Sequence, residues 1–372
     1  MTPASIGTAA RRAALRERIA QAELDALLVT DLINIRYLTG FTGSNAALLV
    51  GVDDSAADDR TVFCTDGRYQ TQSAQQLPEL RRLIDRPCDV TLMAGASGRV
   101  GFEATAVTVA AHQVLTETAA GTTGGAAGAQ LEPTSGLVEQ GRVVKDADEI
   151  AALAKACLVA DQAFADLIAA GGIRVGRTER EVGLDLDQRM RVLGATDPSF
   201  ESIIAAGAHS AIPHHSPTDA LLQAGDLVKF DFGALVAGYH SDMTRTVVLG
   251  QPAGWQREIY QLVAAAQQAG CDAARPGASG DEMDTAARSV IAAAGYGDRF
   301  VHGLGHGVGL QIHEAPAVGH RSAAIMAVDM CVTVEPGVYL PGRGGVRIED
   351  TGVIRPDGYH VLTTTSKELL VL

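Results

Sequence analysis

The sequence predicts an α+β protein with two domains: an N-terminal α/β domain and a larger C-terminal domain in which one arrangement of elements occurs twice. Three observations support this fold class. The chain has 372 residues, 47% of them hydrophobic, which is enough to bury two cores. Its first third alternates helical and strand patterns. The remainder repeats the order helix, helix, β-hairpin, which predicts a pseudo-twofold repeat.

The N-terminal third contains short elements of both kinds. Apolar residues with helical spacing run from Arg11 to Ala22, and apolar runs over residues 26–30 and 46–52 predict strands. A glycine-rich segment, residues 121–128, is unfit for a helix interior and predicts a loop near a domain boundary. We place this boundary near residue 137, which gives domains 1–137 and 138–372.

The first half of the C-terminal domain begins with two predicted helices. Apolar residues recur at steps of three and four over residues 146–171, which indicates one long helix. Thr178 and Glu181 match a capping box, in which the hydroxyl and the carboxylate each accept a backbone N–H, so a second helix begins there. Residues 227–236 and 239–249 then form two β-like segments.

The second half repeats this order. Helical patterns cover residues 252–270 and 280–295, and β-like segments cover residues 331–339 and 345–354. The residues themselves show no strong repeat. The repetition therefore lies in the arrangement of elements.

Composition excludes several classes of function. Forty-four acidic and thirty basic residues give a net charge of −14, which disfavours nucleic acid and anionic lipid in the absence of a basic stripe. No apolar run is long enough to span a membrane, and residues 1–24 lack the apolar region of a signal peptide. Five scattered cysteines without CxxC spacing support neither a disulfide framework nor a thiolate zinc site. We therefore expect a soluble, cytoplasmic protein.

Four carboxylates stand in the two predicted hairpins. One pair is equidistant from a point between positions 236 and 237, and the other is equidistant from Gly342. Residues opposite each other on one face of a hairpin have Cβ atoms about 4.5 to 5.5 Å apart, so each pair is expected to face the same small site. The four residues are Asp231, Asp242, Glu335 and Glu349.

These carboxylates need compensating positive charge. Buried in apolar strands they would repel one another, and two divalent ions supply four positive charges against four negative ones. An imidazole from residues 302–313 would complete a mainly oxygen ligand set, which favours Mn²⁺ or Co²⁺. Two such ions lower the pKa of a shared water and polarise the bond that it attacks, so hydrolysis is the expected chemistry.

Three further histidines are candidates for proton transfer or for donation to an oxyanion, because an unperturbed imidazole titrates near neutral pH. A loop bounded by two prolines holds the first, and the glycine-rich segment after the second helix pair holds the others. They are His214, His302 and His313.

The motifs around these residues resemble those of the pita-bread metallopeptidases, and within them the Xaa-Pro peptidases of the creatinase, aminopeptidase P and prolidase group, closest to the cytoplasmic actinobacterial PepQ type. Residues 34–44 and 65–69 resemble the creatinase-type N-terminal domain, so the resemblance covers nearly the whole chain. The matching C-terminal motifs are Phe200–Gly207, Pro213–Pro217, Asp231 with Asp242, His302–His306, His313–Pro316, Glu335–Tyr339 and Arg347–Asp350.

The resemblance implies a creatinase-like N-terminal domain, a pita-bread catalytic domain and a role for each matching residue. Asp231 would hold one metal, Asp242 and Glu349 would bridge both, and His306 and Glu335 would complete opposite metals. Glu335 would also accept a proton from the metal-bridged water, and the hydroxide that remains would be the nucleophile. On the substrate side, the resemblance implies that His214 and His313 contact the tetrahedral intermediate and that His302 lines the proline-side pocket. Tyr339 and Arg347 would be supports that orient ligands.

The resemblance also implies two divalent ions, with Mn²⁺ expected and Co²⁺ or Zn²⁺ as alternatives, a proline-containing peptide as substrate, and a homodimer. Two positions depart from the family pattern. His209 stands where many relatives have Asn, and Ala317 stands where family dipeptidases often carry an arginine that can bind a free carboxylate as a fork.

The missing arginine favours an Xaa-Pro aminopeptidase that accepts longer peptides. The alternative is an Xaa-Pro dipeptidase, or prolidase, restricted to dipeptides. Two remote alternatives are a non-catalytic pita-bread module that binds protein partners and a metal-free hydrolase resembling creatinase. The complete set of ligands argues against both remote alternatives.

Overall fold

The computed structural model describes residues 7–52, 60–121 and 128–372. The chain forms two compact units, Met1–Arg142 and Val143–Leu372. Most of the predicted glycine-rich loop, residues 122–127, lies outside the described residues.

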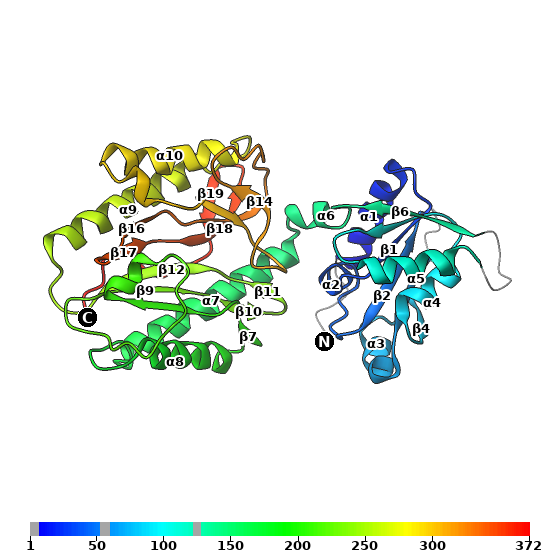
Figure 1. Ribbon diagram of the computed structural model, residues 1–372, viewed down its shortest axis with the longest axis horizontal. Helices are drawn as coiled ribbons and strands as arrows, with labels where there is room; N and C mark the ends of the chain where they lie inside the picture. The colour runs from blue at the N-terminus through cyan, green and yellow to red at the C-terminus, as the bar shows by residue number, and fades with distance from the viewer. Residues whose placement is uncertain (1–6, 53–59, 122–127) are drawn as a thin grey trace. The chain divides into compact units, whose positions relative to one another are not determined.

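Unit 1 is a mixed sheet with the strand order β4-β3-β2-β1-β5-β6. Side chains of α4 and α5 pack on one face of this sheet in an apolar cluster, and Figure 1 shows the unit in blue and cyan. Its elements are α1 (Thr8–Gln21), β1 (Ala26–Val29), α2 (Leu32–Thr39), β2 (Ala46–Gly51), β3 (Thr61–Thr65), η1 (Gly67–Tyr69), α3 (Gln70–Gln76), β4 (Arg81–Ile84), α4 (Cys88–Ala94), β5 (Gly98–Glu103), α5 (Val109–Ala119) and β6 (Ala129–Thr134).

Helix α6 (Glu139–Val143) crosses the division between the units. Its first residues are tied to unit 1, because Tyr37 donates to the carbonyl of Gly141 at 2.6 Å and Arg142 donates to the side chain of Asn34 at 2.9 Å. The contacts of unit 1 therefore extend to the end of this helix.

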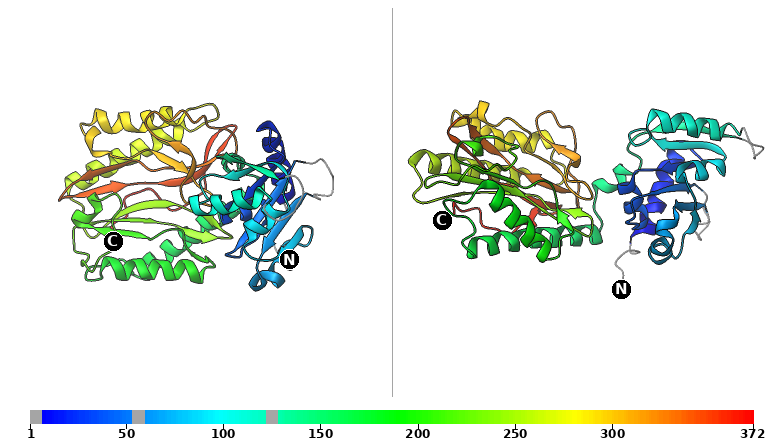
Figure 2. Two further views of the ribbon diagram at one scale, coloured as in Figure 1. Left: turned by 45° about the vertical axis from the view of Figure 1, so that its right-hand side comes forward. Right: turned by 60° about the horizontal axis from the view of Figure 1, so that its bottom comes forward.

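Unit 2 places sheets between two helix pairs. Figure 1 shows α9 and α10 in yellow on one side and α7 and α8 in green on the other, and Figure 2 shows the same layers from two further directions. Its elements are α7 (Ala147–Ala169), α8 (Glu179–Val192), β7 (Asp197–Pro198), β8 (Ile203–Ala206), η2 (Gly207–Ala211), β9 (Leu227–Phe232), β10 (Ala234–Val236), β11 (Tyr239–His240), β12 (Met243–Val248), α9 (Gly254–Ala273), α10 (Gly280–Ala293), η3 (Gly297–Arg299), β13 (Gly305–Gly307), β14 (Glu314–Val318), β15 (Cys331–Val334), β16 (Gly337–Leu340), β17 (Gly344–Arg347), β18 (Asp350–Arg355) and β19 (Gly358–Val361).

The four helices of unit 2 confirm the helical patterns, and three of them begin at a side-chain capping box. Thr178 and Glu181 cap α8, Asp146 and Glu149 cap α7, and Ser279 caps α10 with Glu282. Each cap satisfies backbone donors that the first helical turn leaves without partners. The helix starts are therefore fixed by local sequence.

Each half of unit 2 has its own apolar core. One cluster packs α7 and α8 against β8, β9 and β12, and a second packs α9 and α10 against the strands that follow them. The two halves are similar in architecture, and Leu227 and Val248, at the ends of β9 and β12, extend the second cluster into the first half. Side chains on the strands between the helix pairs lie where the halves meet.

The first hairpin has a register different from the one that sequence symmetry predicts. Asp231 pairs with Thr244, so Asp242 is its diagonal neighbour. The two-residue turn is Ala237-Gly238, with φ of 51° and 84°, as in the type I′ turns that join twisted strands. The turn thus lies one residue later than predicted. Because the pairing changes by two positions, both carboxylates still share a face.

The second hairpin has the predicted register. The ladder pairs Val334 with Asp350 on one side and Gly337 with Arg347 on the other. Glu335 and Glu349, which lie between these pairs, are therefore opposite each other, as predicted.

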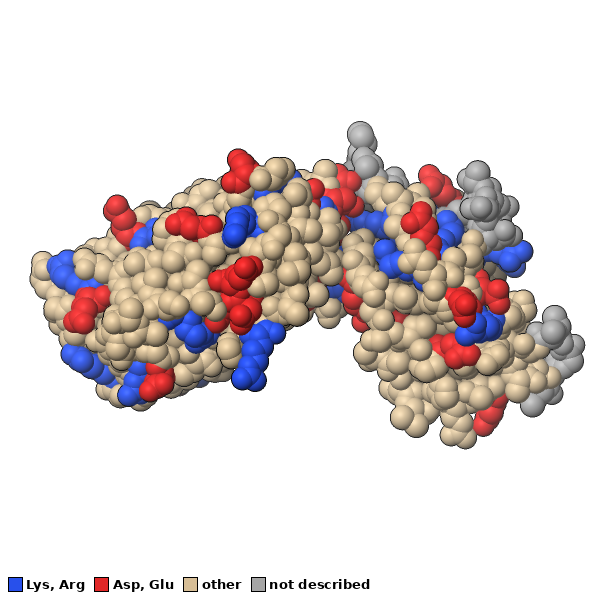
Figure 3. All heavy atoms as spheres, turned by 90° about the horizontal axis from the view of Figure 1, so that it is seen from above, with Lys and Arg blue, Asp and Glu red and all other residues tan. Residues whose placement is uncertain are grey.

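Charged side chains are interspersed on the surface. On the face in Figure 3, lysines and arginines alternate with aspartates and glutamates over both units. Among the described residues, no helix is both long enough and apolar enough to cross a membrane.

The first hairpin turn generates a stability prediction. Ala237 has a left-handed φ of 51°, which costs an ordinary L-residue about 1 kcal/mol and which asparagine tolerates better. Ala237→Asn should stabilise the protein by up to about 1 kcal/mol, and Gly238→Ala should destabilise it by about 1 kcal/mol. Urea midpoints measure both changes, and a lower midpoint for Ala237→Asn would contradict the turn geometry.

Candidate metal centre

A cavity of about 260 Å³ opens between the strands of the two halves of unit 2. Five of its lining residues are the metal ligands predicted from the sequence. The structure brings them together from five different strand positions: Asp231 within β9, Asp242 just before β12, His306 within β13, Glu335 just after β15, and Glu349 just before β18.

Ligand atoms in this group lie close enough to share ions. One atom each from Asp242, His306 and Glu349 falls within 4.8 Å of the others. The Nε2 atom of His306 is 3.5 Å from Asp242 Oδ2 and 3.6 Å from Glu335 Oε1. The cluster is therefore compact around a single imidazole.

Two buried oxygens show that the residues fit a metal. Asp242 Oδ1 and Glu349 Oε1 are shielded from solvent and accept no hydrogen bond from the described residues. A buried carboxylate oxygen without a donor costs free energy that a bound cation recovers. The resemblance implies bridging positions for these two residues, and the oxygen-rich donor set suits a pair of hard divalent ions.

The electrostatics of the cluster point the same way. Burial, followed by repulsion from Glu349, raises the pKa of Glu335 to about 8. Burial and the neighbouring Asp231 and Glu335 raise the pKa of Asp242 well above its usual range, and burial with Asp242 does the same for Glu349. Without cations, burial and mutual repulsion therefore favour the protonated forms of these carboxylates.

Arg347 lies behind the cluster. Its buried guanidinium forms an ion pair with Asp231, donates to Thr244 Oγ1 at 3.0 Å, and lies 3.9 Å from Glu335 Oε2. Thr244 in turn donates to Glu349 Oε2 at 2.7 Å. One arginine therefore orients carboxylates from both hairpins while leaving most of their charge for ions to balance.

Tyr339 and His302 continue this network away from the cavity. Arg347 donates to the Tyr339 hydroxyl at 2.8 Å, and that hydroxyl lies 2.8 Å from His302 Nε2. His302 Nδ1 faces the carbonyl of Gly303 at 2.8 Å. Burial, then the positive charge of Arg347, lowers the pKa of His302 to about 3, so this imidazole is neutral.

His302, Tyr339 and Arg347, which the resemblance implies on the substrate side, are not among the described residues that line the cavity. Arg347 lies beside Asp231 and Glu335, and Tyr339 links Arg347 to His302, so both are placed as supports that orient ligands. His214 and His313 do line the cavity. The ring of His313 is 4.4 Å from that of His306, and burial followed by His306 lowers the pKa of His313.

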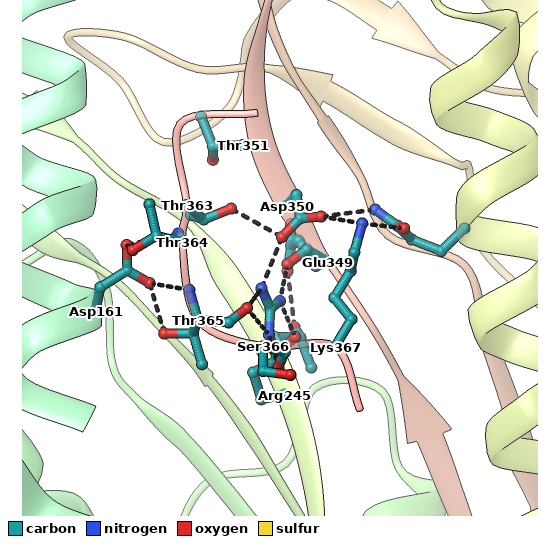
Figure 4. Close-up of polar contacts among 12 residues, drawn as sticks. Asp161, Arg245, Glu349, Asp350, Thr351, Thr363, Thr364, Thr365, Ser366 and Lys367 are labelled. Atoms are coloured by element: carbon teal, nitrogen blue, oxygen red, sulfur yellow. Dashed lines mark hydrogen bonds and ion pairs between the residues drawn. The ribbon is translucent and has the colours of Figure 1, made fainter. Parts of the chain in front are cut away.

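Sequence reasoning missed a buried brace behind Glu349, which Figure 4 shows. Arg245 donates through Nη2 to Asp350 at 2.7 Å and through Nη1 to the main-chain oxygen of Glu349. Lys367 and Thr363 also donate to Asp350, at 2.9 and 2.8 Å. The only sequence signal was a charged residue, Arg245, inside a short strand of threonine and apolar residues.

The C-terminal segment that completes this brace is fastened by Asp161 on α7. Its two oxygens accept hydrogen bonds from the backbone N–H and the hydroxyl of both Thr364 and Thr365, at 2.5 to 2.9 Å. Carbonyls of Thr365 and Ser366 then accept from Arg245. The candidate ligand Glu349 is thus supported through Arg245 by residues 363–367 (Figure 4).

The raised pKa values generate a prediction for metal-depleted protein. Glu335 changes from an ordinary pKa of 4.5 to about 8 in the fold, so the folded state holds protons that the unfolded chain releases. Stability of the metal-depleted protein should therefore fall as pH rises from about 4.5 to 8. Binding of Mn²⁺ at pH 7 should release at least one proton and weaken at lower pH.

Titration calorimetry in two buffers of different ionisation enthalpy measures the proton release, and thermal unfolding at pH 6 and 8 measures the stability. Protein saturated with Mn²⁺ is the control, and its melting temperature should fall less over this range. Binding without proton release would contradict the electrostatic account.

Comparisons with known proteins agree with this geometry. Residues 151–356 match the model of metallopeptidase family M24, and residues 11–144 match that of the creatinase/prolidase N-terminal domain. An uncharacterized peptidase of Bacillus subtilis, YqhT, is 40% identical over 96% of this chain and 99% of its own. An Xaa-Pro dipeptidase of Pyrococcus furiosus is 45% identical over 63% of this chain and 67% of its own.

Among solved structures, the Xaa-Pro dipeptidase from Bacillus anthracis superposes with a TM-score of 0.91 and 36% identity, covering 98% of this chain and 100% of its own. The names of these relatives favour the dipeptidase alternative over the aminopeptidase expectation. The matched domains, the predicted ligand cluster and the pita-bread arrangement together place the chain in metallopeptidase family M24, with a creatinase-type domain preceding its metallopeptidase domain.

Proposed function

We propose that this protein is a two-metal Xaa-Pro peptidase that hydrolyses dipeptides with proline in second position. The observation that carries the proposal is the pair of buried, unpartnered oxygens on Asp242 and Glu349, within reach of His306. When bound there, two divalent ions lower the pKa of a water and polarise the peptide carbonyl. The relatives named Xaa-Pro dipeptidase supply the substrate class.

Glu335 is suited to take the proton of the attacking water. It lines the cavity and its Oε1 lies 3.6 Å from His306 Nε2, so its carboxylate faces the site where the ions would hold the water. A general base must lie within hydrogen-bond reach of the proton that it removes. Arg347, 3.9 Å from the second oxygen of Glu335, orients that carboxylate.

His214 and His313 are suited to the substrate. Both line the cavity without being needed as ligands, and both come from loops rather than from packed helices. An imidazole N–H there can donate to the oxygen that gains charge in the transition state, or deliver a proton to the departing proline nitrogen. We assign these two roles to the pair.

A second candidate, an aminopeptidase for longer peptides, is favoured by Ala317. This residue pairs with His306 across β13 and β14, so its Cβ shares a face with the ligand. An arginine there could bind the free carboxylate of a dipeptide, and alanine cannot. Among the described residues that line the cavity, none is lysine or arginine.

The ligand assignments predict two classes of variant. Asp242→Ala and Glu349→Ala should abolish activity by removing metal. His214→Ala should retain metal and reduce kcat by about 10² or more, the range for a lost oxyanion donor or proton carrier. Metal analysis beside kinetics with an Xaa-Pro dipeptide separates the classes, and a His214→Ala protein that lacks metal would contradict the assignment.

Peptide length decides between the two candidates. With Mn²⁺ present, an Xaa-Pro dipeptide should have a higher kcat/KM than the matched Xaa-Pro-Yaa tripeptide, and a preference for the tripeptide would establish the second candidate. Ala317→Arg should raise the ratio of dipeptide kcat/KM to tripeptide kcat/KM by about tenfold or more, because a bidentate hydrogen bond between arginine and a carboxylate contributes about this much. Ala317→Leu, which adds bulk without charge, is the control. No proline-dependent cleavage with any divalent metal would refute both candidates.

A further inference from the structure

The loop that carries His214 is held at its first end by two buried basic side chains, Lys229 and Arg347. Lys229 Nζ donates to the carbonyls of Ile212 and Pro213 at 2.6 and 3.1 Å, and Arg347 Nη1 donates to Pro213 at 3.2 Å. Lys229 lies on β9, two residues before Asp231, and Arg347 ends β17, two residues before Glu349. The residue before His214 is therefore fixed to the same framework as the ligands.

The second end is held by one carboxylate, that of Glu179. This side chain is fully buried at the first residue of α8. Its Oε1 accepts from the Ala206 N–H at 2.8 Å and from His209 Nδ1 at 2.9 Å. Its Oε2 accepts from His215 Nε2 at 2.9 Å and from the N–H and hydroxyl of Thr218 at 3.0 and 2.7 Å.

These five donors come from both flanks of the loop. Ala206 ends β8 before it, and Thr218 follows it. His215, next to His214 in the chain, is buried and lines the cavity, with its ring 4.4 Å from that of His209. The Glu179 carboxylate thus ties together the two ends of segment 206–218, within which His214 is exposed.

Glu179 is a hydrogen-bond acceptor in this geometry rather than a metal ligand. Single atoms of Glu179, His209 and His215 lie within 4.8 Å of one another, as a metal site would require. However, the five donors already use both carboxylate oxygens. Burial by itself raises the pKa of Glu179, but the donors outweigh it and lower the pKa to about 2, so the group is ionised at neutral pH.

The other half of unit 2 shows that the repeated fold does not require this carboxylate. Glu179 and Gly280 occupy the same position, since each follows a capping residue and donates its backbone N–H to an equivalent carbonyl, of Ala220 and Ala324. A Cβ at Gly280 would meet the carbonyl oxygen of Ala317 at 2.6 Å. Only the half with the His214 loop therefore carries an acid here.

We propose that Glu179 is a positioning residue for the reaction: by binding His215, Ala206 and Thr218 it holds the His214 imidazole at the cavity. This inference rests on the proposed function, because it assumes that His214 acts on the substrate. His209, which stands where many relatives have Asn, donates one more hydrogen bond to the same carboxylate and so belongs to this cluster.

Glu179→Gln tests the proposal. The amide places an NH₂ group against donors, so a backbone N–H of Ala206 or Thr218 loses its acceptor. We expect kcat for an Xaa-Pro peptide to fall about tenfold or more, with metal content unchanged and KM altered less than threefold. Amide hydrogen exchange at residues 206–218 should speed up, and exchange in α9 should not.

A double-mutant cycle separates positioning from general stability. If Glu179 acts through His214, adding Glu179→Gln to His214→Ala should change kcat less than twofold beyond His214→Ala alone. Asp185→Asn is the matched control, since it removes a carboxylate of the same helix whose ion pairs, within the described parts of the chain, are with Arg177 and Arg189. It should lower the melting temperature and leave kcat unchanged.

Several results would overturn the inference. An unchanged kcat in Glu179→Gln would exclude action through His214. So would a double variant whose loss in kcat equals the product of the losses in the two single variants. If Glu179→Gln does not fold, His215→Phe removes one donor alone, and unchanged kcat there would be equally decisive. A wild-type protein that cleaves no Xaa-Pro peptide would refute the proposed function and with it the role of His214, whereas normal cleavage by both variants would refute this inference alone.

Discussion

Carboxylates crowded into an apolar interior are the constraint on which the rest of this structure depends. Asp231, Asp242 and Glu349 are almost fully buried, and such groups stay ionised only if cations or hydrogen bonds compensate them. Arg347 compensates part of the charge. The remainder makes the site a receptor for divalent ions, and the surrounding polar network keeps the carboxylates in place until the ions bind.

The two-half architecture explains how such a cluster is assembled. Each half packs a main apolar cluster beneath its helix pair and contributes one hairpin. The hairpins approach along their inner faces, where Thr244 forms an isolated bridge with Glu349. The crowded carboxylates lie at this seam, held on regular elements as is common for functional sites built on stable scaffolds.

The residues of the site fall into two groups: those that line the cavity, and those that orient the groups lining it. Tyr339, His302 and Arg347 form a chain of hydrogen bonds behind the ligands, while His214 and His313 line the cavity. Supporting residues of this kind are as specific as ligands, because a small displacement of a ligand changes both metal affinity and reactivity. In our proposal, Glu179 extends the same principle to the loop of His214.

The sequence by itself determined the elements and the ligand types. Capping boxes such as Thr178 with Glu181 fixed helix starts, because a cap needs only residues within one turn. Alternating strands with a turn-rich centre placed Glu335 opposite Glu349. The register of the first hairpin needed the backbone angles of Ala237 and Gly238, which a two-residue turn sets and residue symmetry does not reveal.

Only the tertiary structure decided which polar groups meet. Arg347 reaches Asp231 across 116 positions and Thr244 reaches Glu349 across 105, and Arg245 braces Glu349 from a strand with no local signal of that role. Hydrogen bonds of this kind depend on how whole layers pack, whereas caps and turns depend on neighbours in the chain. The candidate ligands could therefore be named from the sequence, whereas the hydrogen bonds that orient them could not.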